Sequence, residues 1–111
     1  MRVKLKVWLE ADDGSPVMGE GTARLLQLVD EHGSLNRAAQ EMRMSYRAAW
    51  GLLQELEQRL GYPLLERQAG GSHGGGSRLT PKGRELLEAF GRLGRRARVA
   101  VAELFQEEFG P

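Results

Sequence analysis

The stretch SLNRAAQEMRMSYRAAWGLLQELEQRL, residues 34–60, predicts two helices joined by a tight connection. Ser34 and Ser45 each stand just before an apolar pattern of helical period, and serine is a preferred N-cap residue because its hydroxyl accepts a backbone N–H of the first turn. Gly61 and Pro63 then end the second helix. The inner faces are Leu35, Ala38, Ala39 and Met42 in the first helix and Ala49, Leu52, Leu53, Leu56 and Leu60 in the second.

The adjacent alanines of the first helix allow the second helix to cross it closely. This layout is that of a helix-turn-helix, whose second helix enters the major groove of DNA. A plain helical hairpin in a small bundle would show the same pattern, so the pattern alone leaves both interpretations open.

A hairpin with a glycine-rich tip is predicted directly after this helix pair. Residues 64–67 and 78–79 are short strand candidates, and residues 68–77 between them contain five glycines. In a winged module such a hairpin is the wing, because glycine lets the backbone approach phosphates and donate to them. The alternatives are a surface loop without a ligand and a nucleotide site, although the lysine of a phosphate-binding G-x-x-x-x-G-K-[ST] loop is missing.

The flanking segments complete the domain. Strict alternation of apolar and polar residues from Val3 to Leu9 predicts an N-terminal strand, which residues 12–16 end with turn chemistry. Helical period from near Glu20 predicts a helix that ends at Gly33.

The last segment, residues 80–109, is predicted to be one long helix, since Thr80 and Pro81 are a strong helix start. Apolar residues follow it at coiled-coil spacing. We expect these residues to pack on a second copy of the chain, together with Leu25 and Leu26, with an intrachain core as the alternative; they are Leu86, Phe90, Leu93, Ala97, Val101 and Leu104.

The predicted fold class is therefore mainly α with a small β wing. It is a single winged helix-turn-helix domain over residues 1–111, with an N-terminal strand, the helix-turn-helix at 34–60, the wing at 64–79 and a C-terminal dimerisation helix at 80–109.

The composition of the chain excludes several kinds of functional site. The chain has no cysteine, which excludes disulfide scaffolds, thiolate zinc sites and cysteine nucleophiles. Residues 34–80 carry six arginines against four glutamates, although the net charge of the whole chain is only +1. A DNA-facing surface could lie in this middle third, and a scattered solvated surface is the alternative. No segment reads as a signal peptide or a membrane span, so we expect a cytoplasmic protein.

Specific motifs extend over nearly the whole chain: GSLNRAA at 33–39, MSYRAAW at 44–50, PLLER at 63–67, GGSHGGG at 70–76 and LTPKG at 79–83. Together they resemble the DNA-binding domain of the ModE family, the molybdate-responsive transcription regulators. The Leu-Thr-Pro step and the Ala-Ala helix also resemble LysR-type regulators. The resemblance implies a dimeric, DNA-binding regulator. ModE proper continues into molybdate-binding domains that nothing here matches, so we expect a DNA-only relative with a separate effector-sensing partner.

The second helix is expected to supply the residues that read DNA. Arg47 lies in its first turn opposite the apolar face, where it could reach a guanine edge or a phosphate. Ser45 should cap the helix and could touch a phosphate, while Tyr46 could donate to a phosphate or pack on the first helix. Gln54, two turns along, could read adenine. Trp50 is expected to pack rather than to read bases.

Phosphate contacts are expected from the neighbouring segments. Arg67 and Arg78 flank the glycine-rich tip as a pair, and Ser72 and His73 lie within it. Arg37, near the start of the first helix, could anchor to the backbone. For each of these residues the alternative is a solvated side chain that makes no contact with DNA.

The expected partners are double-stranded DNA and a second copy of the chain, with no cofactor, no metal and no membrane. We expect no enzyme, because there are no paired carboxylates in a glycine-framed cleft and no nucleophile–base pair. The alternatives are a winged-helix protein-interaction module and a small-molecule- or molybdate-responsive accessory protein.

Overall fold

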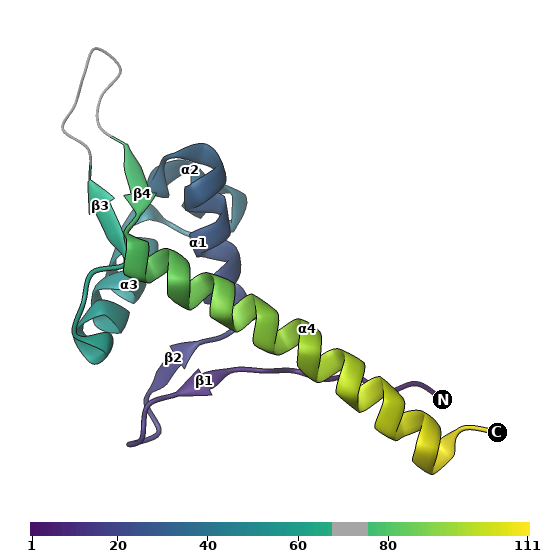
Figure 1. The fold of residues 1–111 in the computed structure, drawn as a ribbon. Helices are drawn as coiled ribbons and strands as arrows, with labels where there is room; N and C mark the ends of the chain where they lie inside the picture. The colour runs from purple at the N-terminus through teal and green to yellow at the C-terminus, as the bar shows by residue number, and fades with distance from the viewer. Residues whose placement is uncertain (68–75) are drawn as a thin grey trace.

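The computed structural model describes residues 1–67 and 76–111 (Figure 1). Within these residues, four helices and two strand pairs follow one another in the order β1 (Leu9–Glu10), β2 (Pro16–Met18), α1 (Glu20–His32), α2 (Leu35–Glu41), α3 (Tyr46–Leu60), β3 (Leu65–Arg67), β4 (Ser77–Leu79) and α4 (Pro81–Phe109). The mainly helical order, with an antiparallel hairpin after α3, confirms the predicted winged helix-turn-helix.

An N-terminal strand is present, but its predicted bounds were wrong. Residues 3–8 form no strand, and β1 begins only at Leu9, where it pairs with the unpredicted strand β2 across the turn at residues 12–15. The alternating side chains Leu5, Val7 and Leu9 are half-buried, as the pattern requires, and Val3 and Leu5 lie beside Val101 of α4. Alternation of apolar and polar residues indicates only that one face of the segment is buried. Here α4 lies against that face, and a helix has no free backbone groups with which a strand could pair.

The predicted helix caps are confirmed. The hydroxyls of Ser34 and Ser45 accept the backbone N–H groups three residues on, at 3.1 and 3.0 Å. The hydroxyl of Thr80 does the same at the start of α4. Gly33 and Gly61 end α1 and α3 with φ of 65° and 80°, in the left-handed region that glycine adopts without a steric cost.

The core lies where α1 meets the crossing of α2 and α3. The side chains that cross there are small: Ala38, Ala39 and Ala49 are fully buried. Leu52 is an exception to the predicted inner face of α3, because 37% of it remains exposed. It stands at the edge of the face formed by Ala49, Leu53 and Leu56, and the described residues leave that edge uncovered.

The two halves of helix α4 lie in different environments. Its first half packs on the body of the domain, and its second half projects away, which makes the molecule 62 Å long and only 29 and 24 Å across (Figure 1). Phe90, predicted to contact a partner, is buried in its own chain together with Leu25 and Leu26, so the intrachain alternative holds for these three residues. Leu86 is also packed against that core.

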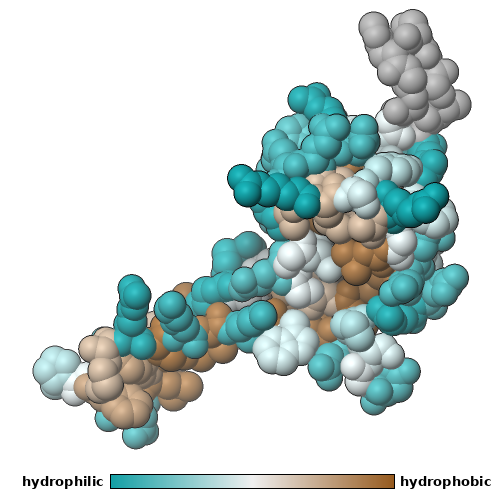
Figure 2. Space-filling view, turned by 180° about the vertical axis from the view of Figure 1, so that it is seen from behind, coloured by the Kyte–Doolittle hydropathy of each residue, from teal (hydrophilic) through white to brown (hydrophobic). Residues whose placement is uncertain are grey.

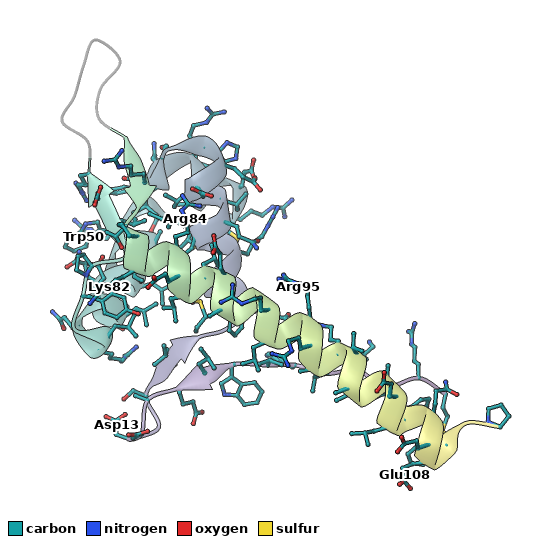
Figure 3. All side chains as sticks on the ribbon, viewed as in Figure 1. Asp13, Trp50, Lys82, Arg84, Arg95 and Glu108 are labelled. Atoms are coloured by element: carbon teal, nitrogen blue, oxygen red, sulfur yellow. The ribbon has the colours of Figure 1, made fainter. Side chains whose placement is uncertain are left out.

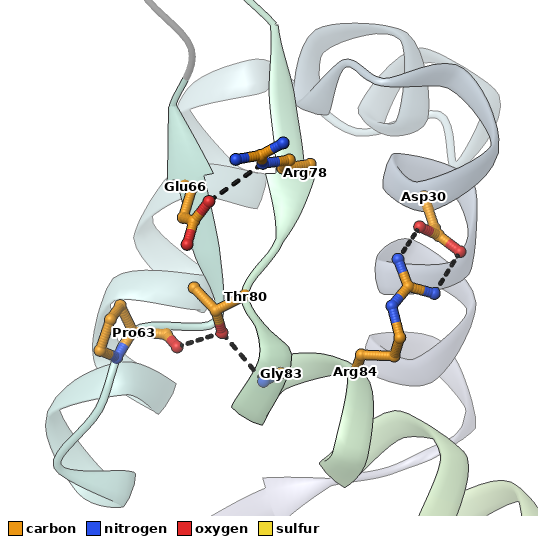
Figure 4. Close-up of polar contacts among 7 residues, drawn as sticks. All are labelled: Asp30, Pro63, Glu66, Arg78, Thr80, Gly83 and Arg84. Carbon is orange, nitrogen blue, oxygen red and sulfur yellow. Dashed lines mark hydrogen bonds and ion pairs between the residues drawn. The ribbon is translucent and has the colours of Figure 1, made fainter.

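Two ion pairs fasten α4 to α1. Arg84 donates to both carboxylate oxygens of Asp30, at 2.6 and 3.1 Å (Figure 4). Arg98 donates to Glu20 at 3.0 Å. Since they join the long helix to α1, they fix the direction in which its free half projects. The hydrogen bonds from Arg84 lower the pKa of the Asp30 carboxyl below its ordinary value.

Asp30→Asn is expected to lower the melting temperature at pH 7 and to matter less in acid. Because the pKa of Asp30 is lowered in the folded state, its stabilisation is present above the unfolded pKa of about 3.9 and is lost as pH falls through the folded pKa. Both partners are more than a third exposed, so the effect at pH 7 is about 1 kcal/mol or less.

The measurement compares the thermal unfolding of wild type and variant at pH 7 and at pH 3. Asp12→Asn, at an exposed turn position, is the control. An equal gap between Asp30→Asn and wild type at both pH values would contradict the proposed role of the ion pair.

Candidate nucleic-acid interface

The first turn of α3 presents an exposed basic and aromatic surface. Ser45 caps the helix, and Ala49 turns inward to the core. Tyr46, Arg47 and Trp50 are all exposed. Arg47 makes no ion pair within residues 1–67 and 76–111. Its guanidinium therefore remains available for an outside acceptor, as predicted from its place opposite the apolar face.

The turn between α2 and α3 fixes how this surface is presented. Arg43 adopts φ of 56°, a left-handed conformation that is unfavourable for a residue with a Cβ. Its N–H donates to the carbonyl of Gln40, and the N–H of Met44 donates to the carbonyl of Ala39, both at 3.0 Å. These bonds hold the strained turn, and the turn sets the angle between the two helices.

The root of the hairpin is tied to α3 and α4. The carboxylate of Glu57 on α3 accepts the N–H groups of Leu64 and Leu65, at 2.6 and 3.3 Å. The hydroxyl of Thr80 donates to the carbonyl of Pro63 at 2.7 Å (Figure 4). The backbone N–H of Thr80 donates to the carbonyl of Leu64 at 2.9 Å. The wing strands therefore leave the body at an angle that α3 determines.

The two wing arginines do not lie side by side on one face of the wing, which corrects the expected pair. Register places Arg78 opposite Glu66 and Arg67 opposite Ser77, so the two arginines point to opposite faces of the hairpin. Arg78 forms an ion pair with Glu66 at 3.0 Å (Figure 4). Arg67 turns toward α3 and donates to the hydroxyl of Tyr46 at 2.7 Å. It is the pairing register of β3 and β4 that puts Arg67 and Arg78 on opposite faces of the hairpin.

The remaining candidates lie at different distances from this surface. Arg37 is exposed on α2. Gln54 is half-buried in a narrow groove between α3 and the wing, where its amide donates to Glu57 at 3.4 Å, so it does not lie on the open outer face as expected. Ser72 and His73 fall outside the described residues.

Two further residues were missed as candidates. Trp50, expected to pack, is 42% exposed beside Arg47, and Figure 3 shows it on the side of the molecule that carries α3 and the wing. Asn36 lines a pocket with Tyr46 and Arg67. Only the exposure of Trp50 in the fold distinguishes it from a core tryptophan, and Asn36 carries no pattern signal at all.

The sequence that forms this arrangement matches a known protein family. The bacterial regulatory helix-turn-helix proteins of the LysR family match residues 22–84, more than half of the chain. The chain belongs to this family. The matched LysR-type segment runs from the start of α1 to the first turn of α4, so it contains the helix-turn-helix and both wing strands.

Named relatives of this LysR-type chain confirm the ModE resemblance. The chain is 35% identical over 89 residues to the molybdenum transport protein ModE of Azotobacter vinelandii, which covers 80% of this chain and 33% of that protein. It is 43% identical over 72 residues to ModE of Herbaspirillum seropedicae, covering 65% and 27%. The chain thus spans about a third of the length of these relatives.

A solved structure shares the fold. The crystal structure of ArgP from Mycobacterium tuberculosis matches with a TM-score of 0.57 and 27% identity, over 79% of this chain and 31% of that one. No helix in the described part of the chain is both long and apolar enough to cross a bilayer.

Proposed function

We propose that this chain is a sequence-specific, DNA-binding transcriptional regulator that inserts the first turn of α3 into the major groove. The observation that carries the proposal is the exposed side chain of Arg47 next to a hairpin whose root is tied to the same helix. Arginine can bind the O6 and N7 atoms of guanine with two hydrogen bonds, which discriminates among bases. Membership of a regulatory helix-turn-helix family and the likeness to the ModE regulators support it.

The arginines around this surface support phosphate binding. Arg37 lies on α2 and Arg67 on the wing strand β3, and both are exposed. Contacts of this kind position a protein on the duplex and release counterions. Residues 34–80, which contain α2, α3 and the wing strands, carry six arginines against four glutamates.

Salt titration of duplex binding tests the proposal. Binding of a mixed-sequence duplex is measured by fluorescence anisotropy between about 50 and 200 mM salt, and affinity should fall steeply, since each neutralised phosphate contributes a slope of about −0.9. Affinity that does not change with salt would favour the protein-interaction module instead.

We further propose that α4 joins two copies of the chain. Beyond the buried Phe90, α4 carries Leu93 and Leu104, 46% and 56% exposed, on the seam that also holds the half-buried Ala97. Figure 2 shows the projecting second half of α4 largely in the apolar colour. Val101 of the predicted seam lies partly against the N-terminal segment of its own chain. A twofold dimer would bind half-sites about one helical turn apart, or a multiple of that.

Leu104→Glu should convert the dimer to a monomer without unfolding it, because the side chain lies outside the core and a buried carboxylate in the seam would be unpaired. Sedimentation equilibrium measures the mass. Val99→Glu, equally exposed on the neighbouring flank of α4, is the control. A wild type that sediments as a monomer at all concentrations would reject the proposal.

The effector, a separate sensing partner, the cytoplasmic location and the absence of enzymatic activity stay predictions.

A further inference from the structure

One pocket lies where α2, α3 and the wing meet. It has a volume of about 290 Å³ and is lined by Ser34, Leu35, Asn36, Tyr46, Arg67, Gly76 and Ser77. All but Leu35 and Gly76 bring a polar side chain, and none of these lining residues is acidic. The pocket is therefore an electropositive one, rich in hydrogen-bond donors.

Its walls are held in place from two sides. The N–H of Ser77 donates to the carbonyl of Gly33 at 2.9 Å, which pins the wing to the start of α2. A Cβ on Gly76 would stand 2.7 Å from that same carbonyl oxygen, so this close approach requires glycine. On the opposite side the hydrogen bond from Arg67 to Tyr46 joins the wing to α3.

The hydrogen bond between Arg67 and Tyr46 leaves donors to spare. The phenolic oxygen accepts from one Nη of Arg67, so the Tyr46 O–H proton and the other N–H groups of Arg67 can still donate. Ser34 likewise accepts through its oxygen in capping α2 and keeps its own hydroxyl proton. Within the described residues Arg67 has no carboxylate partner. The positive charge of Arg67 is therefore available to an outside anion.

We propose that this pocket seats one phosphodiester group of the DNA backbone, and that Tyr46 is a positioning residue that aims Arg67 at it. The inference rests on the proposed function and names one phosphate among the contacts expected there. The site lies between the first turn of α3 and the wing, so a groove-bound α3 brings a backbone phosphate past it. Arg67 supplies the charge, and Tyr46 holds the guanidinium in one orientation.

A double-mutant cycle separates positioning from independent contact. Duplex affinity of the full chain is measured for Tyr46→Phe, Arg67→Gln and the double variant across a salt series, using a duplex selected by wild type from a random pool. Tyr46→Phe should weaken binding about three- to tenfold, the worth of one hydrogen bond, and should have no effect once Arg67 is replaced. Arg67→Gln alone should lower the salt slope by about one.

Tyr62→Phe is the matched control, because Tyr62 lies just beyond the far end of α3, under the ammonium of Lys82. Circular dichroism and thermal unfolding verify that each variant is folded. The same loss from Tyr46→Phe with and without Arg67, or no loss at all, would overturn the proposal.

Neutral methylphosphonate links, placed one at a time along the selected duplex, identify the phosphate. One link per half-site should weaken wild type and leave Arg67→Gln unaffected; a scan without such a position overturns the inference. Competition by inorganic phosphate at constant ionic strength tests a free-anion site. Displacement of phosphate by the duplex supports the shared pocket, and simultaneous binding of both contradicts it.

The two proposals fail in different ways. Salt-independent duplex binding defeats the DNA-binding function itself. Salt-dependent binding that Arg47→Ala weakens, with Tyr46→Phe equal to wild type, defeats only the phosphate pocket.

Discussion

Arg47→Ala is expected to lower affinity for the selected duplex by about 5- to 150-fold while changing affinity for unrelated DNA far less. The reason is that one bidentate contact to a base discriminates by about 1–3 kcal/mol, whereas nonspecific binding rests on many phosphates. Arg47 has an exposed side chain on a well-capped helix, so its removal should leave the fold intact. Anisotropy with specific and scrambled duplexes measures both affinities.

Arg95→Ala is the control for charge alone. Arg95 also lies on an exposed surface, but on α4, away from Trp50 and the wing (Figure 3). It should change specific and scrambled binding little and equally. If the two substitutions had the same effect on specific binding, α3 would not be the reading element.

Gly83→Ala is expected to destabilise the protein by about 1–3 kcal/mol, which is the usual cost of overpacking a well-packed site. A Cβ at this position would stand 2.6 Å from the carbonyl oxygen of Leu64 and 3.1 Å from the Thr80 hydroxyl oxygen. The carbonyl belongs to the backbone and already accepts the N–H of Thr80 at 2.9 Å, so it cannot withdraw without breaking the wing root. Thermal and urea unfolding measure the loss.

Gly51→Ala is the matched control, since the same methyl group meets nothing within 4 Å in the middle of α3. Alanine favours a helix over glycine by about 1 kcal/mol, so this variant should be more stable than wild type. Opposite signs for the two substitutions are the expected result. A neutral or stabilising Gly83→Ala would show that α4 does not pack against the wing root as described.

Local chemistry made the helices predictable. Ser34, Ser45 and Thr80 were identified as caps because a short hydroxyl before an apolar pattern has one dominant use, and the structure confirms each. The glycines that end α1 and α3 were equally clear, since few other residues adopt positive φ without cost.

Tertiary placement was less predictable. Alternation in residues 3–9 reported a covered face but not what covers it. Apolar spacing along α4 was the same for Phe90, which joins its own core, and for Leu104, which is exposed. The faces on which Arg67 and Arg78 lie depend on the pairing register of the two wing strands. The glycine-rich segment between the strands does not specify that register. In each case the missing information lies in another segment of the chain.

The most direct test is a footprint of the duplex on the protein by amide hydrogen exchange. The account predicts that binding protects the start of α3, around residues 46–51, together with the strands β3 and β4, and leaves the second half of α4 unchanged in a preformed dimer. Protection confined to the arginines of α4 at 92–98, with the start of α3 exchanging as in the free protein, would contradict it.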